Sequence, residues 1–456
     1  MMRSTPRPGG GAPPVAERIS YGRMGNAVRT DRRGVHYAVS LVIVVGSMMS
    51  TVVLADREVE LPFLIICGAV AALVLALHRR EPEPRQATNV RVVVALLATG
   101  GLVLWDHMRP VSTWSAPAYW VPIIWVLILL AFAASAYRID AFSLAFWDCS
   151  RFLAVVGLLG LGISYLSGTP FLSNLWNGLF RAQSLMPEPA ALAPLVSAGV
   201  LLSWNRRRIS WLVVFVLVGL GSLSPMVLLV LALSISLWMI ADRTGLWGLV
   251  AVGLTAVSFS TLLAGALRNA AMSTLTWSDP RLTETPLLIP LNRLVSSYLQ
   301  FTGESVGWQD SGRQASARLV REFLESQGVS RTGIGFGNDG VLADAFNMQP
   351  NALVPHFALA WGYLVAWGLV SLLCVGVLSR YRQADFPIFL PFLVTALLNS
   401  AGGWQCYGLV LLGAVAPHLA RTVGSGTVPP SARQKAFETA PQNHSPRRTR
   451  NGSTTP

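Results

Sequence analysis

The sequence predicts an all-α, polytopic membrane protein with about 12 transmembrane helices and one long extracytoplasmic loop that contains amphipathic helices. Of the 456 residues, 52% are hydrophobic and only 12% are charged, whereas soluble domains carry roughly a quarter charged residues. The apolar residues form runs of nearly membrane-spanning length, and the basic residues alternate between the segments that join these runs. This composition excludes a soluble enzyme.

The apolar runs define the predicted spans. A membrane helix needs about 20 predominantly apolar residues, with roughly 17 to 25 usual. Pro225 separates the seventh and eighth runs and predicts a tight turn, because proline does not continue a helix cleanly. The predicted spans are 35–54, 61–77, 90–105, 118–137, 146–166, 189–204, 208–223, 225–241, 246–266, 353–379, 386–400 and 404–420.

The basic residues orient these spans. Of the 35 basic residues, 25 lie in segments that the twelve spans place on one side. Of the remaining 10, six lie in one long loop and a seventh, Arg268, lies at the edge of that loop. Short cytoplasmic loops are rich in Lys and Arg, and long loops are exempt from this bias. Both tails are therefore predicted in the cytoplasm. The net charge of +13 follows from this topology, and we expect no binding to nucleic acid.

The chain thereby divides into five parts. Residues 1–34 and 421–456 are polar and basic, which predicts disordered cytoplasmic tails. Residues 35–266 hold spans 1–9, residues 267–352 form the long extracytoplasmic loop, and residues 353–420 hold spans 10–12.

The cysteines predict no special chemistry. None of the four belongs to a CxxC or Cys/His pattern with metal-ligand spacing. We therefore expect buried small residues, no disulfide, no metal site and no cofactor. The four are Cys67, Cys149, Cys374 and Cys406.

The long loop contains two amphipathic stretches. In 291–301, apolar residues recur at helical spacing, namely Leu291, Leu294, Val295 and Tyr298. In 312–327, one helix side is apolar, with Leu319, Val320, Phe323 and Leu324. The other side is charged, with Arg318, Arg321, Glu322 and Glu325. Such helices lie on a membrane surface or cap a helix bundle.

Ionisable residues at the outer mouth of an apolar bundle are costly and usually functional, and three places qualify. The first holds Arg181 and Glu188, just before a predicted span. The arginine is suited to bind an anion, and the carboxylate is suited to accept a proton. Alternatively, Glu188 is a helix cap, because Pro189 suits a first helical turn and a carboxylate there complements the helix dipole.

The second place holds Arg313, Arg318 and Arg321, followed by a turn with Gly333, Gly335 and Gly337. Several arginines that face one cavity hold a diphosphate through charge-assisted hydrogen bonds. The glycines permit a tight turn with exposed backbone N–H groups, although the spacing is not that of a GxGxxG phosphate cradle. The alternative is an amphipathic helix with a solvated charged face, followed by a structural turn.

The third place is His356, three residues into the tenth predicted span and after Asn351 and Pro355. The functional interpretation makes its imidazole a base or a substrate contact. The alternative is a hydrogen-bonded histidine at the membrane interface.

The order of these motifs resembles the bacterial O-antigen ligase/polymerase superfamily of membrane glycosyltransferases. Arg181 and the Glu188-Pro189 pair precede a mid-chain span, and Gly312-Arg313 precedes an amphipathic helix in the long loop. A Gly-x-Gly-x-Gly-Asn turn and a His at the start of a span follow. The resemblance covers roughly residues 170–380. The family often has Ser or Thr after Glu-Pro and Asn after the His, where this chain has Ala190 and Phe357.

The resemblance implies a multi-pass enzyme of the bacterial inner membrane. Its substrate is a polyprenyl-diphosphate-linked saccharide, which the enzyme joins to a hydroxyl of another sugar chain. It implies Arg313 and Arg181 as diphosphate contacts, with Arg318 or Arg321 in support. His356 and Glu188 are alternative catalytic bases. Membrane lipid and other polysaccharide-assembly proteins are the expected partners.

Three functions compete. A polymerase of lipid-linked repeat units is favoured, for exopolysaccharide, capsule or O-antigen synthesis. A ligase that transfers finished glycan to a lipid or cell-wall acceptor shares its chemistry. A flippase or transporter for lipid-linked saccharide tends to place charges inside its spans, whereas the spans predicted here are nearly free of charge.

Overall fold

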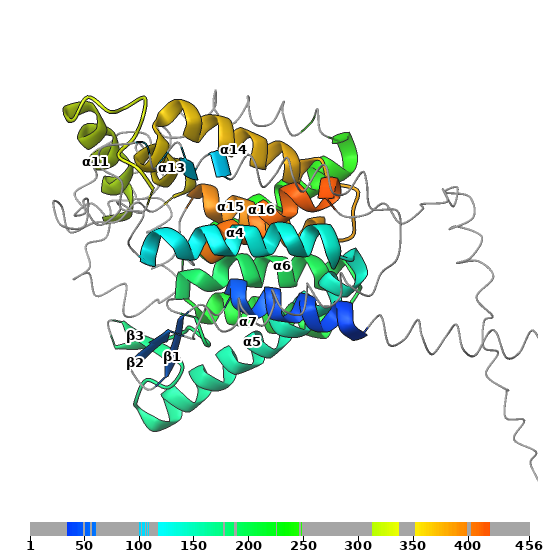
Figure 1. Cartoon of the computed structure of the whole chain (residues 1–456). Helices are drawn as coiled ribbons and strands as arrows, with labels where there is room; N and C mark the ends of the chain where they lie inside the picture. The colour runs from blue at the N-terminus through cyan, green and yellow to red at the C-terminus, as the bar shows by residue number, and fades with distance from the viewer. Residues whose placement is uncertain are drawn as a thin grey trace, which may run out of the picture. The chain divides into compact units, whose positions relative to one another are not determined.

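The computed structural model describes residues 34–48, 51–54, 57–60, 117–176, 178–186, 189–224, 226–245, 312–336, 352–398 and 403–419, with Gly248 and isolated positions between 100 and 108. The chain divides into two units, Met1–Ala420 and Arg421–Pro456, and every described residue belongs to the first. This part of the chain is mostly helical (Figure 1).

Most predicted spans within the described residues are helical. Two helices, Ile139–Ser167 and Met226–Gly245, are long and apolar enough to cross a membrane. Apart from Gly248, the predicted spans 61–77 and 246–266 lie outside the described residues, as do most of 90–105 and all of the amphipathic stretch 291–301. The shorter apolar helices include Gly34–Met48, α4 (Pro117–Ser135), α6 (Leu192–Asn205), α7 (Ile209–Gly221), α14 (Tyr363–Leu378), α15 (Phe386–Leu398) and α16 (Gly403–Leu419).

The long helix α5 (Ile139–Ser167) has a buried face and an exposed apolar face. Its buried face packs into the core through Phe142, Phe146 and Leu153. A continuous exposed apolar stripe is what a helix presents to lipid. The exposed residues recur at helical spacing and are Leu144, Phe152, Val155, Leu159, Ile163 and Leu166.

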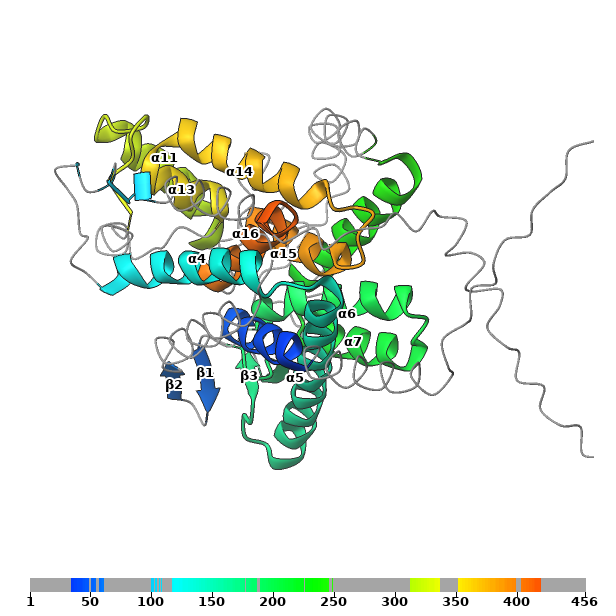
Figure 2. The ribbon, with the colours of Figure 1, turned by 45° about the vertical axis from the view of Figure 1, so that its right-hand side comes forward.

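The helices α6 and α15 are the most completely buried. Residues 192–203 of α6 and 386–396 of α15 are all buried, and the two helices pack on each other. Figure 2 shows α16 between α4 and α14, and it contacts both. A Cβ at Gly413 would lie 2.7 Å from the Phe389 ring, so glycine lets α16 approach α15 closely.

The prediction of an all-α protein misses two short antiparallel hairpins. β1 (Thr51–Leu54) and β2 (Arg57–Glu60) form the first. Among the described residues of the predicted span 35–54, those up to Met48 are helical and Thr51–Leu54 form a strand. Thr and Val at its end favour a strand, and an apolar run alone does not distinguish strand from helix. The second hairpin lies in the predicted loop 167–188 and carries a candidate site residue.

Candidate active site

The second hairpin positions Arg181. Its strands, β3 (Ser173–Trp176) and β4 (Leu179–Ala182), pair with Asn174 opposite Arg181. The Arg181 side chain is buried, and its Nε–H donates to the carbonyl oxygen of Ser222 over 3.0 Å. Since Ser222 directly follows α7, the hairpin fixes a guanidinium at the end of a predicted membrane helix.

Small residues on α5 make room for this hairpin. A Cβ at Gly160 would lie 2.8 Å from the Cβ of Leu172. One turn further on, the hydroxyl of Ser164 forms a 2.7 Å hydrogen bond with the hydroxyl of Ser173. At the other end of the hairpin, Ser184 donates its hydroxyl to the carbonyl of Leu153 over 2.7 Å. Both ends of the hairpin are thus anchored to one helix.

Three residues around the hairpin hold a left-handed backbone without being glycine. They are Leu172 (φ 50°), Ser184 (φ 61°) and Leu223 (φ 46°), and the Ser184 N–H donates to the Leu172 carbonyl over 3.1 Å. Each such conformation costs on the order of 1–3 kcal/mol and persists only where the surroundings determine it. Strain of this kind concentrates at functional sites, which supports a functional role for the Arg181 hairpin.

Glu188, the predicted neighbour of Arg181, lies outside the described residues. Pro189–Ala191 form a 3-10 turn, η1, before α6. A proline suits this place because its φ is already close to the helical value. Among the described residues, the N-cap of α6 is Ala191, which makes no side-chain capping hydrogen bond. The two roles predicted for Glu188, catalytic base and helix cap, therefore both remain predictions.

The predicted amphipathic helix 312–327 is confirmed as α11 (Gly312–Ser326). Val320 and Leu324 are buried on one side, whereas Arg321 and Glu325 are exposed on the other and form an ion pair of 3.0 Å. Contact between Arg321 and a substrate would require this surface pair to open, at a cost of about 0.3–0.5 kcal/mol. Arg313 and Arg318 belong to the same helix, but their side chains lie outside the described part of the structure.

The tenth predicted span, 353–379, is broken into α13 (Leu353–Trp361) and α14. The break is at Gly362, which has φ +83° and faces the carbonyl group of Arg331 so closely that a Cβ would collide with it. The prediction of one continuous helix is wrong here because hydropathy does not register a single glycine that is needed for its positive φ.

The glycine-rich turn after α11 is hydrogen-bonded to the end of α13, next to this break. Ile334 and Gly335 donate their N–H groups to carbonyls at the end of α13, over 2.8 and 3.0 Å. Phe336 donates its N–H to the Asp106 carboxylate over 2.8 Å. These groups satisfy polar atoms of the protein, so the turn is structural at these positions and not an open phosphate cradle. Gly337 lies outside the described residues.

His356 lies in the first turns of α13, as predicted, and is 8% exposed. Its ring meets the Tyr407 ring of α16 edge-on, with centroids 5.8 Å apart. The side chain is therefore buried between helices and is not an exposed interfacial histidine. Because α11 packs on α13, the helix that carries Arg313 and the helix that carries His356 are neighbours.

The described contacts place the candidate residues at two positions. Arg181 lies against the end of α7, on a hairpin anchored to α5. His356 belongs to α13, and its ring meets α16. The helix α13 packs on α11, which carries Arg313. Among the described residues, no group of three or more His, Cys, Asp or Glu side chains is placed to hold a metal ion.

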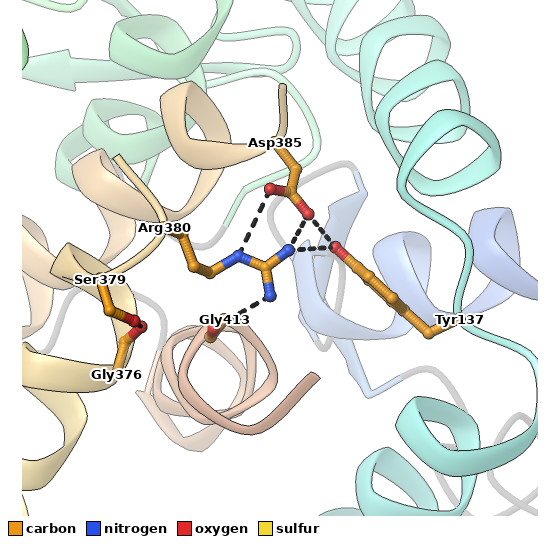
Figure 3. A network of polar contacts seen from close by, with 6 residues as sticks. All are labelled: Tyr137, Gly376, Ser379, Arg380, Asp385 and Gly413. Atoms are coloured by element: carbon orange, nitrogen blue, oxygen red, sulfur yellow. Dashed lines mark hydrogen bonds and ion pairs between the residues drawn. The ribbon is translucent and has the colours of Figure 1, made fainter. Parts of the chain in front are cut away.

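A buried charge cluster escaped the sequence analysis. Arg380 and Asp385 lie in the turn between α14 and α15, are at most 1% exposed, and form an ion pair. Tyr137, just after α4, donates its hydroxyl to Asp385 and accepts a hydrogen bond of 3.0 Å from Arg380 (Figure 3). Arg380 also donates to the carbonyl of Gly413 in α16 over 3.3 Å.

This cluster pins the ends of several helices together. The Arg380 guanidinium lies 5.1 Å from the centroid of the Phe389 ring, a favourable cation–π position. The sequence signal was an Arg and an Asp five residues apart in a short loop. The positive-inside rule counts such an arginine when it assigns the side of a loop. The count is the same whether the side chain is exposed or buried. We assign the cluster a structural role.

The sequence matches no protein-family model, and a search of curated proteins likewise gives no match.

Proposed function

We propose that the protein is a metal-independent membrane glycosyltransferase that polymerises polyprenyl-diphosphate-linked saccharide repeat units at the outer leaflet of a bacterial inner membrane. The observation that carries the proposal is Arg181, a buried guanidinium on a strained hairpin at the end of α7, which is a predicted membrane helix. A fixed guanidinium is suited to bind a diphosphate. The resemblance to the O-antigen ligase/polymerase superfamily supplies the substrate class.

A membrane location with about 12 spans and both tails in the cytoplasm supports this activity. The arginine alternation orients the spans, and α5 has the length and the exposed apolar stripe of a lipid-facing helix. A second such stripe lies on α14. Its exposed residues are Leu364, Trp367, Leu372 and Val375.

The proposed reaction is glycosyl transfer with a diphosphate leaving group. The acceptor hydroxyl oxygen attacks the anomeric carbon, a new C–O bond forms, and the bond to the diphosphate oxygen breaks. Polyprenyl diphosphate leaves with the bonding electrons, and the acceptor proton passes to His356 or Glu188. Arg181 and Arg313 stabilise the charge that develops on the leaving group, which is the role of preorganised donors in a transition state.

The test is a product-length assay on purified protein reconstituted with a polyprenyl-diphosphate oligosaccharide. A ladder of lengths supports the polymerase. A single addition to a lipid acceptor identifies the ligase, and transfer of unreacted substrate across the membrane identifies a flippase. Arg181→Lys should slow formation of the ladder about a hundredfold, whereas Arg243→Lys, at an exposed arginine near the end of helix Met226–Gly245, should form it at the wild-type rate.

A further inference from the structure

The turn between α6 and α7 combines three arginines with two exposed apolar side chains. Its sequence is Trp-Asn-Arg-Arg-Arg-Ile, from Trp204 to Ile209. Trp204 is 65% exposed and Ile209 is 76% exposed. Arginine and tryptophan together are typical of the membrane interface, where an apolar body meets charged headgroups.

Arg206 is held in place by α5. Its Nη2 donates to the hydroxyl of Ser143 over 2.9 Å, and its guanidinium lies 5.0 Å from the centroid of the Trp147 ring. Such a contact fixes the guanidinium without neutralising it. The turn is therefore anchored at its first arginine, and the next two arginines are exposed.

A fourth arginine belongs to the same surface. Arg151 of α5 stacks 4.1 Å from the centroid of the Trp211 ring and pairs with Asp148 over 3.5 Å. Asp148 also accepts the hydroxyl of Tyr37 over 3.0 Å. We call Arg151, Arg206, Arg207 and Arg208, with Trp147 and Trp211, the Arg/Trp cluster. Against the single charge of Asp148, its four arginines leave three positive charges in excess.

Arg207 occupies a backbone position that favours glycine. Its φ is +54°, and the N–H of Arg208 donates to the carbonyl of Ser203 over 2.9 Å. This six-to-one hydrogen bond after a left-handed residue is the Schellman ending of a helix, where glycine is usual. An arginine here costs folding free energy, which is consistent with selection for its charge.

We propose that the Arg/Trp cluster binds the phosphate of an anionic phospholipid at the cytoplasmic ends of α5, α6 and α7. The proposal rests on the membrane topology given above and not on glycosyl transfer. Basic pockets between membrane helices on the cytoplasmic side bind anionic headgroups. A lipid is favoured over free phosphate because an exposed apolar stripe for an acyl chain starts at the turn and continues along α7. Its residues are Ile209, Val213, Leu217 and Leu220.

The test is a titration of detergent-solubilised full-length protein with short-chain phosphatidylglycerol and with phosphatidylcholine, followed by native mass spectrometry. We expect wild type to prefer phosphatidylglycerol. The double variant Arg207→Gly with Arg208→Gln should bind it about thirtyfold more weakly, since each interfacial arginine contributes about a factor of five. Glycine suits the positive φ at position 207, so the variant should unfold at a temperature no lower than that of wild type.

The control is Arg382→Gln, at an exposed arginine in the turn between α14 and α15, which the same topology places on the cytoplasmic side. It should bind phosphatidylglycerol like wild type. Equal affinity of wild type for both lipids, or unchanged binding by the double variant, would overturn the proposal. Competition by inorganic phosphate at the concentration of the lipid would also overturn it in favour of a soluble anion.

Discussion

Arg181 donates its Nε–H to the carbonyl oxygen of Ser222 over 3.0 Å and so joins the β3–β4 hairpin to the end of α7. This bond fixes the orientation of a buried guanidinium at the end of α7.

Replacing Arg181 with lysine should therefore lower turnover by about a hundredfold, comparable to the loss of one preorganised donor in a transition state. Lysine is a point charge and cannot hold the Ser222 carbonyl and a phosphate in one plane. The measurement is the rate of glycan extension at matched levels of inserted protein. Turnover close to wild type would return Arg181 to a structural role.

The base can be identified by comparing His356→Gln with Glu188→Gln. The true base should lose about 10²–10⁴-fold in turnover, and the other residue should lose much less. Glutamine keeps a polar side chain opposite Tyr407, so the protein should insert normally. The assay is single-turnover extension of a lipid-linked oligosaccharide. If neither change slows it, both residues are excluded as the base.

The Arg380–Asp385 pair should dominate stability at its end of the bundle. Asp385→Asn leaves a buried guanidinium without its carboxylate, and we expect a loss of about 3–5 kcal/mol in the free energy of unfolding. The exposed pair of Arg321 and Glu325 provides the control, because Arg321→Gln should cost no more than about 0.5 kcal/mol. Denaturant unfolding in detergent measures both, and equal costs would contradict the burial of the cluster.

Gly362 and Gly368 form a matched pair on one stretch of chain. Alanine at Gly362 must adopt φ +83° and displace the Arg331 carbonyl, so we expect destabilisation by about 2 kcal/mol or more. Alanine at Gly368 meets no atom within 4 Å and should be neutral or slightly stabilising. Thermal unfolding of the two variants distinguishes them. Equal unfolding temperatures would show that the break between α13 and α14 does not depend on glycine.

Two exposed positions test the orientation in the membrane. In a variant without native cysteines, Glu325→Cys in α11 should react with a membrane-impermeant maleimide in intact spheroplasts. Ser210→Cys, at the start of α7, should react only after permeabilisation. Both side chains are exposed, so accessibility reports the side of the membrane. The reverse pattern would refute the proposed topology.

Local patterns predicted the helices well. The spacing of Val320 and Leu324 predicted the buried side of α11, which is seen in the structure. The predicted span 208–223 corresponds to α7, Ile209–Gly221. These features depend on residues within a few turns of one another, which a periodic pattern records.

The features that escaped prediction depend on distant partners. Tyr137 meets Asp385 across 248 positions of sequence, and no local pattern encodes that meeting. The β3–β4 hairpin depends on space that Gly160 of α5 provides. For the same reason, the sequence could nominate Arg181 and His356 singly but could not say which helices surround them.

The nine-residue helix α13 is held from several directions. Its last carbonyls accept the N–H groups of Ile334 and Gly335, its sides pack on α11 and on α14, and His356 meets Tyr407 of α16. A ligand that shifts α11 would therefore press on a short helix that is packed on every side described, so that the position of the loop and the position of the His356 imidazole are coupled.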